Sequence, residues 1–128
     1  MKLLLDTHVF LWWISDARDL PKRARERIAD GQSHLYWSAA SSWEVAIKFA
    51  LGRLKLSKAP ERFIPDELMR NRVESLPIVD AHALRAGLLP PHHRDPFDRM
   101  LVAQAQIEGL VLLTNDPRLR RYEVHIEW

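Results

Sequence analysis

Cysteine is absent from this chain, so disulfide bonds and thiolate zinc sites are excluded. A membrane span is not expected either, because charged residues interrupt every apolar run before it is long enough to cross a bilayer. Residues 1–15 have the apolar content of a secretion signal, but Asp6 and His8 interrupt them and no small-residue cleavage site follows. The lack of cysteine agrees with a reducing compartment, and we predict a cytoplasmic protein.

The length of the chain sets the scale of the fold. With 128 residues, it can bury one sizeable hydrophobic core but not two independent ones. The sequence shows no internal repeat, low-complexity segment or interdomain linker, so we predict a single domain over residues 1–128. The formal net charge is only +2, yet basic residues cluster at 22–27 and 118–121. These clusters predict basic surface patches, which suit either solvent or a polyanionic partner.

Short apolar runs alternate with amphipathic stretches along the chain. The run at 2–5 is continuously apolar, as expected of a central strand covered by helices on both faces. Strands are predicted at 2–5, 34–38, 73–78, 110–113 and 122–126, and helices at 7–15, 21–29, 39–51, 60–72 with an interruption at Pro65, 80–88 and 96–108. Strands that alternate with helices are joined by right-handed crossovers. The sequence therefore predicts an α/β fold, a three-layer α/β/α sandwich around a central, mostly parallel sheet.

Carboxylates recur where the predicted strands end or where the next helix begins. Asp6 directly follows the first strand, Glu44 lies in the first turn after the second, and Asp116 follows the strand at 110–113. Asp98 stands at the start of a helix. Ligands of an open parallel sheet bind beyond the carboxyl ends of its strands, so we expect these acids to converge there. Convergent carboxylates repel one another unless a hard divalent cation such as Mg²⁺ lies among them, which favours metal-dependent phosphodiester chemistry.

Each acid also has a purely structural explanation. Asp6 is suited to capping the first helix, and the sequence from Ser41 to Glu44 fits a capping box. Asp95 before a proline is an equally sound helix start, and Asp116 before another proline suits a turn. Capping requires no particular number of acids at one edge, whereas binding Mg²⁺ requires several oxygen ligands. The combination therefore favours a metal site, while capping stays open for any single acid.

Other side chains are given structural roles. Lys48 lies four residues after Glu44, so an ion pair on one helix face is expected, and that pair would also orient Glu44. His92 and His93 lie in a proline-rich loop, where we expect exposed side chains rather than zinc ligands, because no further His or Cys completes a tetrahedral set. Ser41 and Ser42 have no histidine at a spacing that supports a hydrolase triad. Core or interface packing is predicted for Trp12, Trp13, Trp37 and Trp43, and Trp43 belongs to an apolar helical stripe with Ile47, Ala50 and Leu51.

Four segments, in this order, resemble the PIN-domain family: LLLDTHVFLWW, SSWEVAIKFALGRLKL, HRDPFDRMLVAQA and LLTND. Their sequences are similar to those of the VapC-type toxin branch, and the resemblance extends over nearly the whole chain. A haloacid dehalogenase-type phosphatase fits poorly, because its pattern requires a second aspartate two residues after the first, where this chain has His8.

The resemblance implies an endoribonuclease that depends on Mg²⁺, with Mn²⁺ as a substitute. It also implies a homodimer that pairs with an antitoxin protein, whose tail covers the active site. By motif, Asp6, Glu44, Asp98 and Asp116 are the four acids of the family, and the fourth is the most variable of them.

Four further residues are assigned to the predicted site. Asp95 is an additional acid of the RDPFD version and is a metal ligand, a supporting group or the helix cap. Thr114 matches the small hydroxyl residue that often precedes the fourth acid, where it hydrogen-bonds a carboxylate or water. As a substrate-binding hypothesis, Arg94 or Arg99 contacts a phosphate beside the scissile bond, and solvation at the surface explains either one equally well.

We hypothesise that Asp6 and Asp98 bind Mg²⁺ directly, whereas Glu44 and Asp116 complete the site through water or hold a second ion. The ion activates water for in-line attack on phosphorus and neutralises charge on the phosphate oxygens. The products should therefore carry 5′-phosphate and 3′-hydroxyl ends. Two alternatives stay open: a PIN-type nuclease of RNA maturation or DNA processing, and a non-catalytic RNA-binding or interaction module.

Overall fold

The structure is a computed structural model that describes residues 1–128, and its centre is a five-stranded sheet in the order β3-β2-β1-β4-β5. Every neighbouring pair of strands is parallel. The strands are β1 (Lys2–Leu5), β2 (His34–Ser38), β3 (Val73–Leu76), β4 (Val111–Leu113) and β5 (Ile126–Glu127). The predicted parallel sheet is thus confirmed, and its middle strand is the apolar run near the start of the chain.

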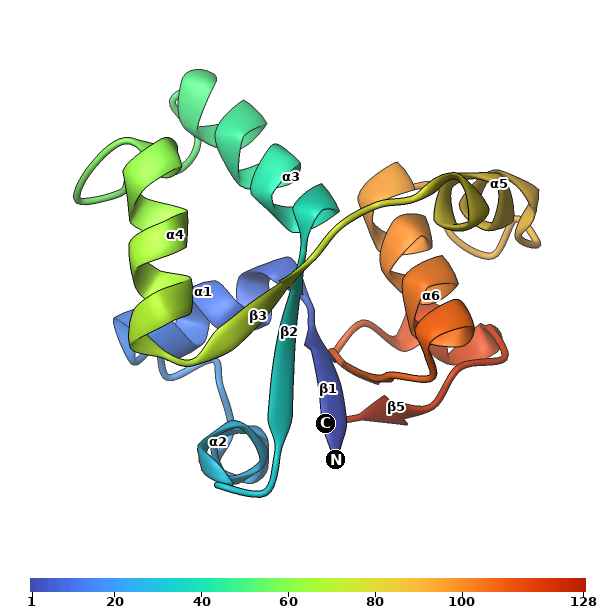
Figure 1. Ribbon diagram of the computed structural model, residues 1–128, viewed down its shortest axis with the longest axis horizontal. Coiled ribbons are helices and arrows are strands. Elements are labelled where there is room, and N and C mark those ends of the chain that lie inside the picture. The colour runs from blue at the N-terminus through green and yellow to red at the C-terminus, as the bar shows by residue number, and fades with distance from the viewer.

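Helices cover both faces of the sheet (Figure 1). They are α1 (Thr7–Ser15), α2 (Lys22–Ala29), α3 (Ala39–Ala50), α4 (Pro60–Arg70), α5 (Asp80–Leu88), α6 (Pro96–Glu108) and the short 3-10 helix η1 (Pro117–Arg121). In Figure 1, α1, α2 and α4 lie on one side of the sheet, and α5 and α6 lie together on the other. This arrangement confirms the α/β/α layering. None of these helices has the length and apolar content that a bilayer crossing requires.

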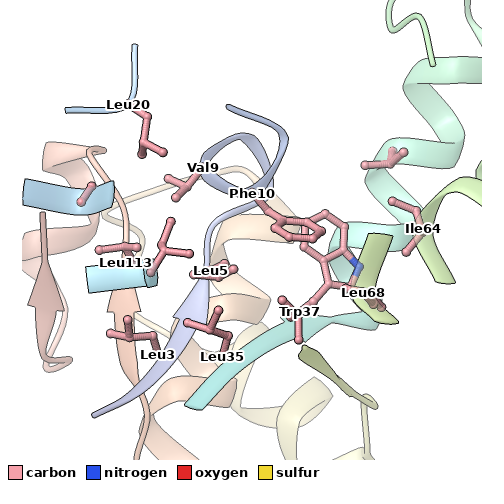
Figure 2. Close-up of a cluster of buried hydrophobic side chains, with 14 of the residues drawn as sticks. Leu3, Leu5, Val9, Phe10, Leu20, Leu35, Trp37, Ile64, Leu68 and Leu113 are labelled. Atoms are coloured by element: carbon pink, nitrogen blue, oxygen red, sulfur yellow. The ribbon is translucent and has the colours of Figure 1, made fainter. Parts of the chain in front are cut away.

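The middle strand buries side chains on both faces, which is why its sequence is apolar throughout. Leu3 and Leu5 point into a cluster that also contains Phe10 and Trp37, whose rings lie 5.1 Å apart (Figure 2). Leu4 points the opposite way, into a second cluster formed mainly by α6 and β4. All three leucines are fully buried, and each such burial contributes about 1.5–3 kcal/mol to the free energy of unfolding. The carboxyl end of β1 is therefore held firmly between the two helical layers.

The boundaries of α6 follow from its sequence. The Asp95 carboxylate accepts hydrogen bonds from the backbone N–H groups of Phe97 and Asp98 at 2.8 and 3.1 Å, and Pro96 occupies the first turn. Gly109 ends the helix in the left-handed conformation, with φ at 67°, which glycine adopts without a steric penalty. Both predicted ends are confirmed, and Asp98 is fixed on the first turn of α6.

The predicted apolar stripe of α3 does not enter the core. Trp43 and Leu51 are 62% and 61% exposed, whereas Ser41 is buried on the opposite side of the helix. Small residues face inward because α3 approaches α1 closely there, and Thr7 Oγ1 donates a hydrogen bond to Ser41 Oγ at 2.7 Å. Of the two predicted roles, core packing is confirmed for Trp37, which is fully buried, and is wrong for Trp43, for which interface packing stays a prediction.

α3 also begins earlier than the predicted capping box requires. The helix starts at Ala39, and Ser38 caps it by accepting a hydrogen bond from the backbone N–H of Ala40 at 3.0 Å. The capping-box prediction for Ser41 and Glu44 was therefore wrong. Glu44 lies in the second helical turn rather than the first, and its carboxylate is not used to close the helix end.

Three other predicted boundaries differ from the structure. α4 runs through Pro65 without a break, because the proline removes only one helical hydrogen bond from a helix that packs firmly on the core. β3 ends at Leu76, before a proline that has no N–H to offer a neighbouring strand. The last strand does not extend over 122–126, because Tyr122 packs into the second cluster instead and donates a hydrogen bond to the Pro90 carbonyl at 2.7 Å.

Candidate active site

Asp6 lies directly after β1, and its side chain is 2% exposed. Its backbone N–H donates to the Leu113 carbonyl at 3.1 Å, Oδ2 accepts a hydrogen bond from Thr114 Oγ1 at 2.6 Å, and Oδ1 lies 3.4 Å from His8 Nδ1. Asp6 occupies the N-cap position of α1, but its side chain makes no capping hydrogen bond, so the capping explanation holds for the position of Asp6 and not for its carboxylate. Burial raises the pKa of Asp6 above its usual value. The nearby Glu44 charge adds to this shift, while His8 and Thr114 oppose it.

Glu44 reaches the same site from α3. Its side chain is 13% exposed and accepts a hydrogen bond from Lys48 Nζ at 2.7 Å, which confirms the pair predicted from the sequence. The hydrogen bond between Thr7 and Ser41 holds the first turns of α1 and α3 together. Glu44 is consequently close enough to Asp6 for its negative charge to raise the Asp6 pKa.

Asp98 approaches from the first turn of α6. Burial raises the pKa of Asp98 to about 8, and the negative charges of four other carboxylates add to the shift, those of Asp6, Asp95, Glu44 and Asp116. Charge–charge effects of this kind weaken with distance, so all five carboxylates share one region. The structure thus brings together the acids that the sequence placed on four separate segments.

Asp116 lies at the start of η1 and caps that helix. Its carboxylate accepts hydrogen bonds from the backbone N–H of Arg118 at 2.9 Å and from the Arg118 guanidinium at 3.1 and 3.0 Å. Burial acts to raise the pKa of Asp116, but the hydrogen bonds and charge of Arg118 outweigh it and hold the pKa below its usual value. Asp116 therefore caps a helix and faces the acidic cluster at the same time.

His93 belongs to the site, although the sequence predicted an exposed loop residue. Its side chain is 4% exposed, and Nε2 lies 2.9 Å from Asp98 Oδ2 and 3.2 Å from Asp116 Oδ2. Nδ1 accepts a hydrogen bond from the backbone N–H of Asp95 at 3.2 Å. The prediction was wrong because burial of this loop depends on Tyr122, a residue distant in sequence whose hydroxyl accepts from the His93 N–H at 3.0 Å. The only signal in the sequence was the position of the histidine just before RDPFD.

The two arginines predicted to contact phosphate have different surroundings. Arg99 Nη2 donates to the carbonyl oxygens of Ala86 and Leu89 at 2.8 and 3.0 Å, and Nη1 donates to that of Pro90 at 3.1 Å. These bonds commit the guanidinium to the end of α5 and the loop that follows it, so the structure assigns Arg99 to this segment rather than to a substrate. Arg94 is exposed, and its phosphate contact stays a prediction.

The donor atoms of the cluster match a hard divalent cation. Carboxylate oxygens are ligands that suit Mg²⁺ and Mn²⁺ in proteins. Repulsion among the acids contributes to the raised pKa of Asp98, and a divalent ion would relieve it. Asp95 differs from the others, because its Oδ1 already accepts two helix N–H groups. The residues suited to hold an ion are therefore Asp6, Glu44, Asp98 and Asp116, while Asp95 supports the helix start.

A hollow of about 590 Å³ opens beside the acidic cluster, between α1 and the segment that joins α3 to α4. Its wall nearest the carboxylates includes His8 and Glu44. Most of the lining is apolar, and three basic side chains also contribute to it, Lys48, Arg53 and Lys55. Glu44 is thus the acid that joins the cluster to a surface that combines apolar area and positive charge.

The chain is similar to known proteins along nearly its whole length. A family model for the PIN domain matches residues 3–124. Ribonuclease VapC22 from Mycobacterium tuberculosis is 30% identical over 121 residues, which cover 94% of this chain and 91% of that protein.

Solved structures share the same fold. The crystal structure of VapBC2 from Rickettsia felis, bound to a DNA fragment from the promoter, has a TM-score of 0.72 at 15% identity and covers 99% of this chain and 98% of the compared chain. DNA-bound VapBC from Salmonella typhimurium has a TM-score of 0.67 at 25% identity, with coverage of 99% and 97%. The five-stranded parallel sheet, the sequence match and these neighbours agree, and the chain therefore belongs to the PIN domain family, in the branch of the VapC ribonucleases.

Proposed function

We propose that the protein is a metal-dependent endoribonuclease and the toxin of a toxin–antitoxin pair. The observation that carries the proposal is the convergence of carboxylates on Asp98, whose pKa is raised to about 8 by burial and by its acidic neighbours. The relatives support the class of reaction, because the Mycobacterium tuberculosis protein is named a ribonuclease. The structural neighbours support a partner, because they are VapBC complexes.

Asp6 and Asp98 would hold Mg²⁺ or Mn²⁺ directly, and Glu44 and Asp116 would complete the site. When bound, such an ion supplies Lewis-acid activation of water and neutralises charge on the phosphate. Thr114 fixes the orientation of the Asp6 carboxylate through its hydrogen bond to Oδ2. Because water is the nucleophile, the cleaved RNA should carry 5′-phosphate and 3′-hydroxyl ends.

We place the RNA strand along the hollow beside the carboxylates. Arg53 and Lys55 line this hollow and attract phosphate groups, while the partly exposed ring of Trp12 offers apolar surface to bases. Arg94 is exposed next to the acidic motif and is the second expected phosphate contact. An RNA strand placed in this way contacts both the positively charged surface and the acidic cluster, and it does not need a contact with Arg99.

The direct test is cleavage of total RNA by the purified protein in Mn²⁺, with mapping of the cut ends. We expect EDTA and Asp98→Asn each to abolish cleavage, while circular dichroism shows a folded protein. Asp19→Asn is the matched control, since Asp19 is exposed between α1 and α2. Full cleavage by Asp98→Asn, or products with 2′,3′-cyclic phosphate ends, would contradict the proposed mechanism. Binding of RNA without metal-dependent cleavage would support the interaction-module alternative.

The toxin assignment has its own test. Expression of the active chain in the cytoplasm, where its RNA substrate lies, should arrest the growth of the cells. Expression of the Asp98→Asn variant should not. Co-expression of the cognate antitoxin, a small protein that binds this chain, should restore growth. Metal-dependent cleavage without growth arrest would instead indicate a nuclease of RNA maturation or DNA processing.

We also expect a homodimer, because the molecule exposes large apolar side chains. Leu84 and Leu88 on α5 are 67% and 85% exposed, and Trp43 lies exposed on α3. Light scattering after gel filtration should give twice the chain mass. Leu84→Asp should shift the protein toward monomer. Met69→Asp is the matched control, because Met69 is also exposed but lies on α4, on the opposite side of the sheet from α5 (Figure 1). A wild-type monomer would refute this part of the proposal.

A further inference from the structure

His93 is fixed in one orientation by hydrogen bonds at three points. Its backbone N–H donates to the Tyr122 hydroxyl at 3.0 Å, and its carbonyl accepts from Arg99 Nη1 at 3.2 Å. Ring Nδ1 accepts from the Asp95 N–H at 3.2 Å, and the Tyr122 hydroxyl is itself tied to the Pro90 carbonyl at 2.7 Å. The ring cannot turn without breaking bonds among buried groups, and leaving such groups unpaired is costly.

The hydrogen bond at Nδ1 determines which ring nitrogen carries the proton. An imidazole nitrogen that accepts a hydrogen bond has no proton, so the neutral ring carries its proton on Nε2. Nε2 lies 2.9 Å from Asp98 Oδ2 and 3.2 Å from Asp116 Oδ2. The ring therefore presents one N–H to two carboxylates of the acidic cluster, which come from α6 and from the start of η1.

We propose that His93 is a positioning residue of the metal site, whose Nε2–H holds Asp98 and Asp116 in the orientation that binds the ion. The inference rests on the proposed function. A donor shared by the Oδ2 atoms fixes the rotation of Asp98 and leaves its Oδ1 for the ion. Hydrogen-bond partners that orient metal-binding carboxylates contribute about 10- to 100-fold to metal affinity or activity.

A direct metal ligand is the rival role for His93. Its ring nitrogen and the carboxylate oxygens of Asp98 and Asp116 lie within 4.8 Å of one another, which is close enough to surround an ion. Ligation through Nε2 requires that nitrogen to lose its proton, and the neutral ring would then carry its proton on Nδ1. Two donors, Nδ1–H and the Asp95 N–H, would then face each other, and the hydrogen bond between them would be lost. The hydrogen bonds of the loop thus favour the donor role.

The test compares three substitutions at one position. In His93→Gln, the side-chain amide reaches the place of Nε2 and keeps an N–H donor there. In His93→Asn, the amide is too short to reach the carboxylates, and His93→Leu removes the polar group altogether. His92→Gln is the matched control, because the His92 ring contacts the Tyr122 ring and forms no hydrogen bond of its own.

Calorimetric titration with Mn²⁺ in the absence of RNA is the principal measurement. We expect Mn²⁺ affinity to fall about 10- to 100-fold in His93→Leu and His93→Asn, and to be largely retained in His93→Gln and His92→Gln. Cleavage at low Mn²⁺ should fall in parallel and recover as Mn²⁺ is raised, with the KM for RNA unchanged. Thermal unfolding identifies any variant that fails to fold. If His93→Leu fails to fold, the comparison of His93→Gln with His93→Asn decides the result.

Each alternative outcome has a definite meaning. Wild-type affinity in His93→Asn and His93→Leu would overturn the inference and leave the proposed function intact. Affinity lost in His93→Gln as well would overturn the donor role in favour of direct ligation. Wild-type protein that neither binds Mn²⁺ nor cleaves RNA would overturn the proposed function and this inference together.

Discussion

Thr114 Oγ1 donates a 2.6 Å hydrogen bond to Asp6 Oδ2, and so joins the ends of the two neighbouring strands β1 and β4. The same hydroxyl oxygen accepts a hydrogen bond from the backbone N–H of Asp116 at 3.1 Å. One threonine thereby links two acids of the cluster. The buried carboxylate of Asp6 needs such a donor, because burial alone raises its pKa.

Replacing Thr114 with valine should weaken the acidic site while keeping the shape of the side chain. Asp6 loses a hydrogen bond in a buried place, so we expect the free energy of unfolding to fall by about 1–3 kcal/mol. Mn²⁺ affinity should fall as well, because the Asp6 carboxylate is no longer held. Thr114→Ser is the control that keeps the hydroxyl. Urea unfolding and Mn²⁺ titration check the prediction, and equal behaviour of the two variants would refute it.

Removing the charge of Asp98 should stabilise the metal-free protein at neutral and alkaline pH. The folded-state pKa of Asp98 is about 8, against a usual value of 3.8. A raised carboxyl pKa means that its contribution to stability is complete below pH 3.8 and is lost as the pH rises through 8. The advantage of Asp98→Asn over wild type should therefore grow between about pH 4 and 8. Unfolding in EDTA across this range measures it.

Saturating Mn²⁺ should remove that advantage, because an ion that binds only the folded wild type stabilises it. Asp19→Asn, with its exposed carboxylate, is the control and should show no such dependence on pH. An unchanged difference between Asp98→Asn and wild type from about pH 5 to 9 would show that Asp98 is not crowded by the other acids.

Substitution of Arg99 should lower stability rather than RNA affinity. Its guanidinium donates to several backbone carbonyls at the end of α5 and in the loop that carries His93. Lysine cannot reproduce this planar set of donors, so Arg99→Lys should cost about 1–3 kcal/mol in the free energy of unfolding. Arg94→Ala should leave stability nearly unchanged and raise the KM for RNA. A raised KM in Arg99→Lys, with no loss of stability, would indicate instead that Arg99 contacts the RNA substrate.

The hollow beside the cluster should contribute to the salt dependence of RNA binding. Each phosphate that a protein neutralises on a single strand contributes about 0.7 to the slope of log K against log salt. Arg53→Ala combined with Lys55→Ala should therefore flatten the slope by about 1.4 if both side chains bind phosphate. Binding to the cleavage-deficient Asp98→Asn protein, measured at several salt concentrations, gives this value. Lys22→Ala is the control, since Lys22 lies on α2, at the opposite end of the sheet from the hollow (Figure 1).

Local sequence patterns were sufficient for most elements of the fold. The apolar run of β1 and the Asp-Pro start and glycine end of α6 are signals contained within a few neighbouring residues, and both were confirmed. The last strand and the inner face of α3 were predicted less well. Their placement depends on contacts between distant segments, such as the packing of Tyr122 against the loop at Pro90.

The acids of the candidate site were identifiable for the same local reason. Each of them stands in a short motif at the end of a strand or the start of a helix, and the order of these motifs resembles one family. Their roles were less accessible. For Asp6 the sequence left helix capping open beside metal binding, and only the structure shows that its carboxylate accepts a hydrogen bond from Thr114 and none that caps the helix.

The sequence by itself determined the parallel α/β fold and the set of acids that meet at the ends of the strands. Only the tertiary structure decided that His93 enters the cluster and that Arg99 is committed to the loop. The physical reason is the short range of the hydrogen bond, which forms only when donor and acceptor come within about 3 Å. Whether groups from separate segments reach that distance depends on how the helices pack on the sheet. The sequence pattern of a single segment carries no information about that packing.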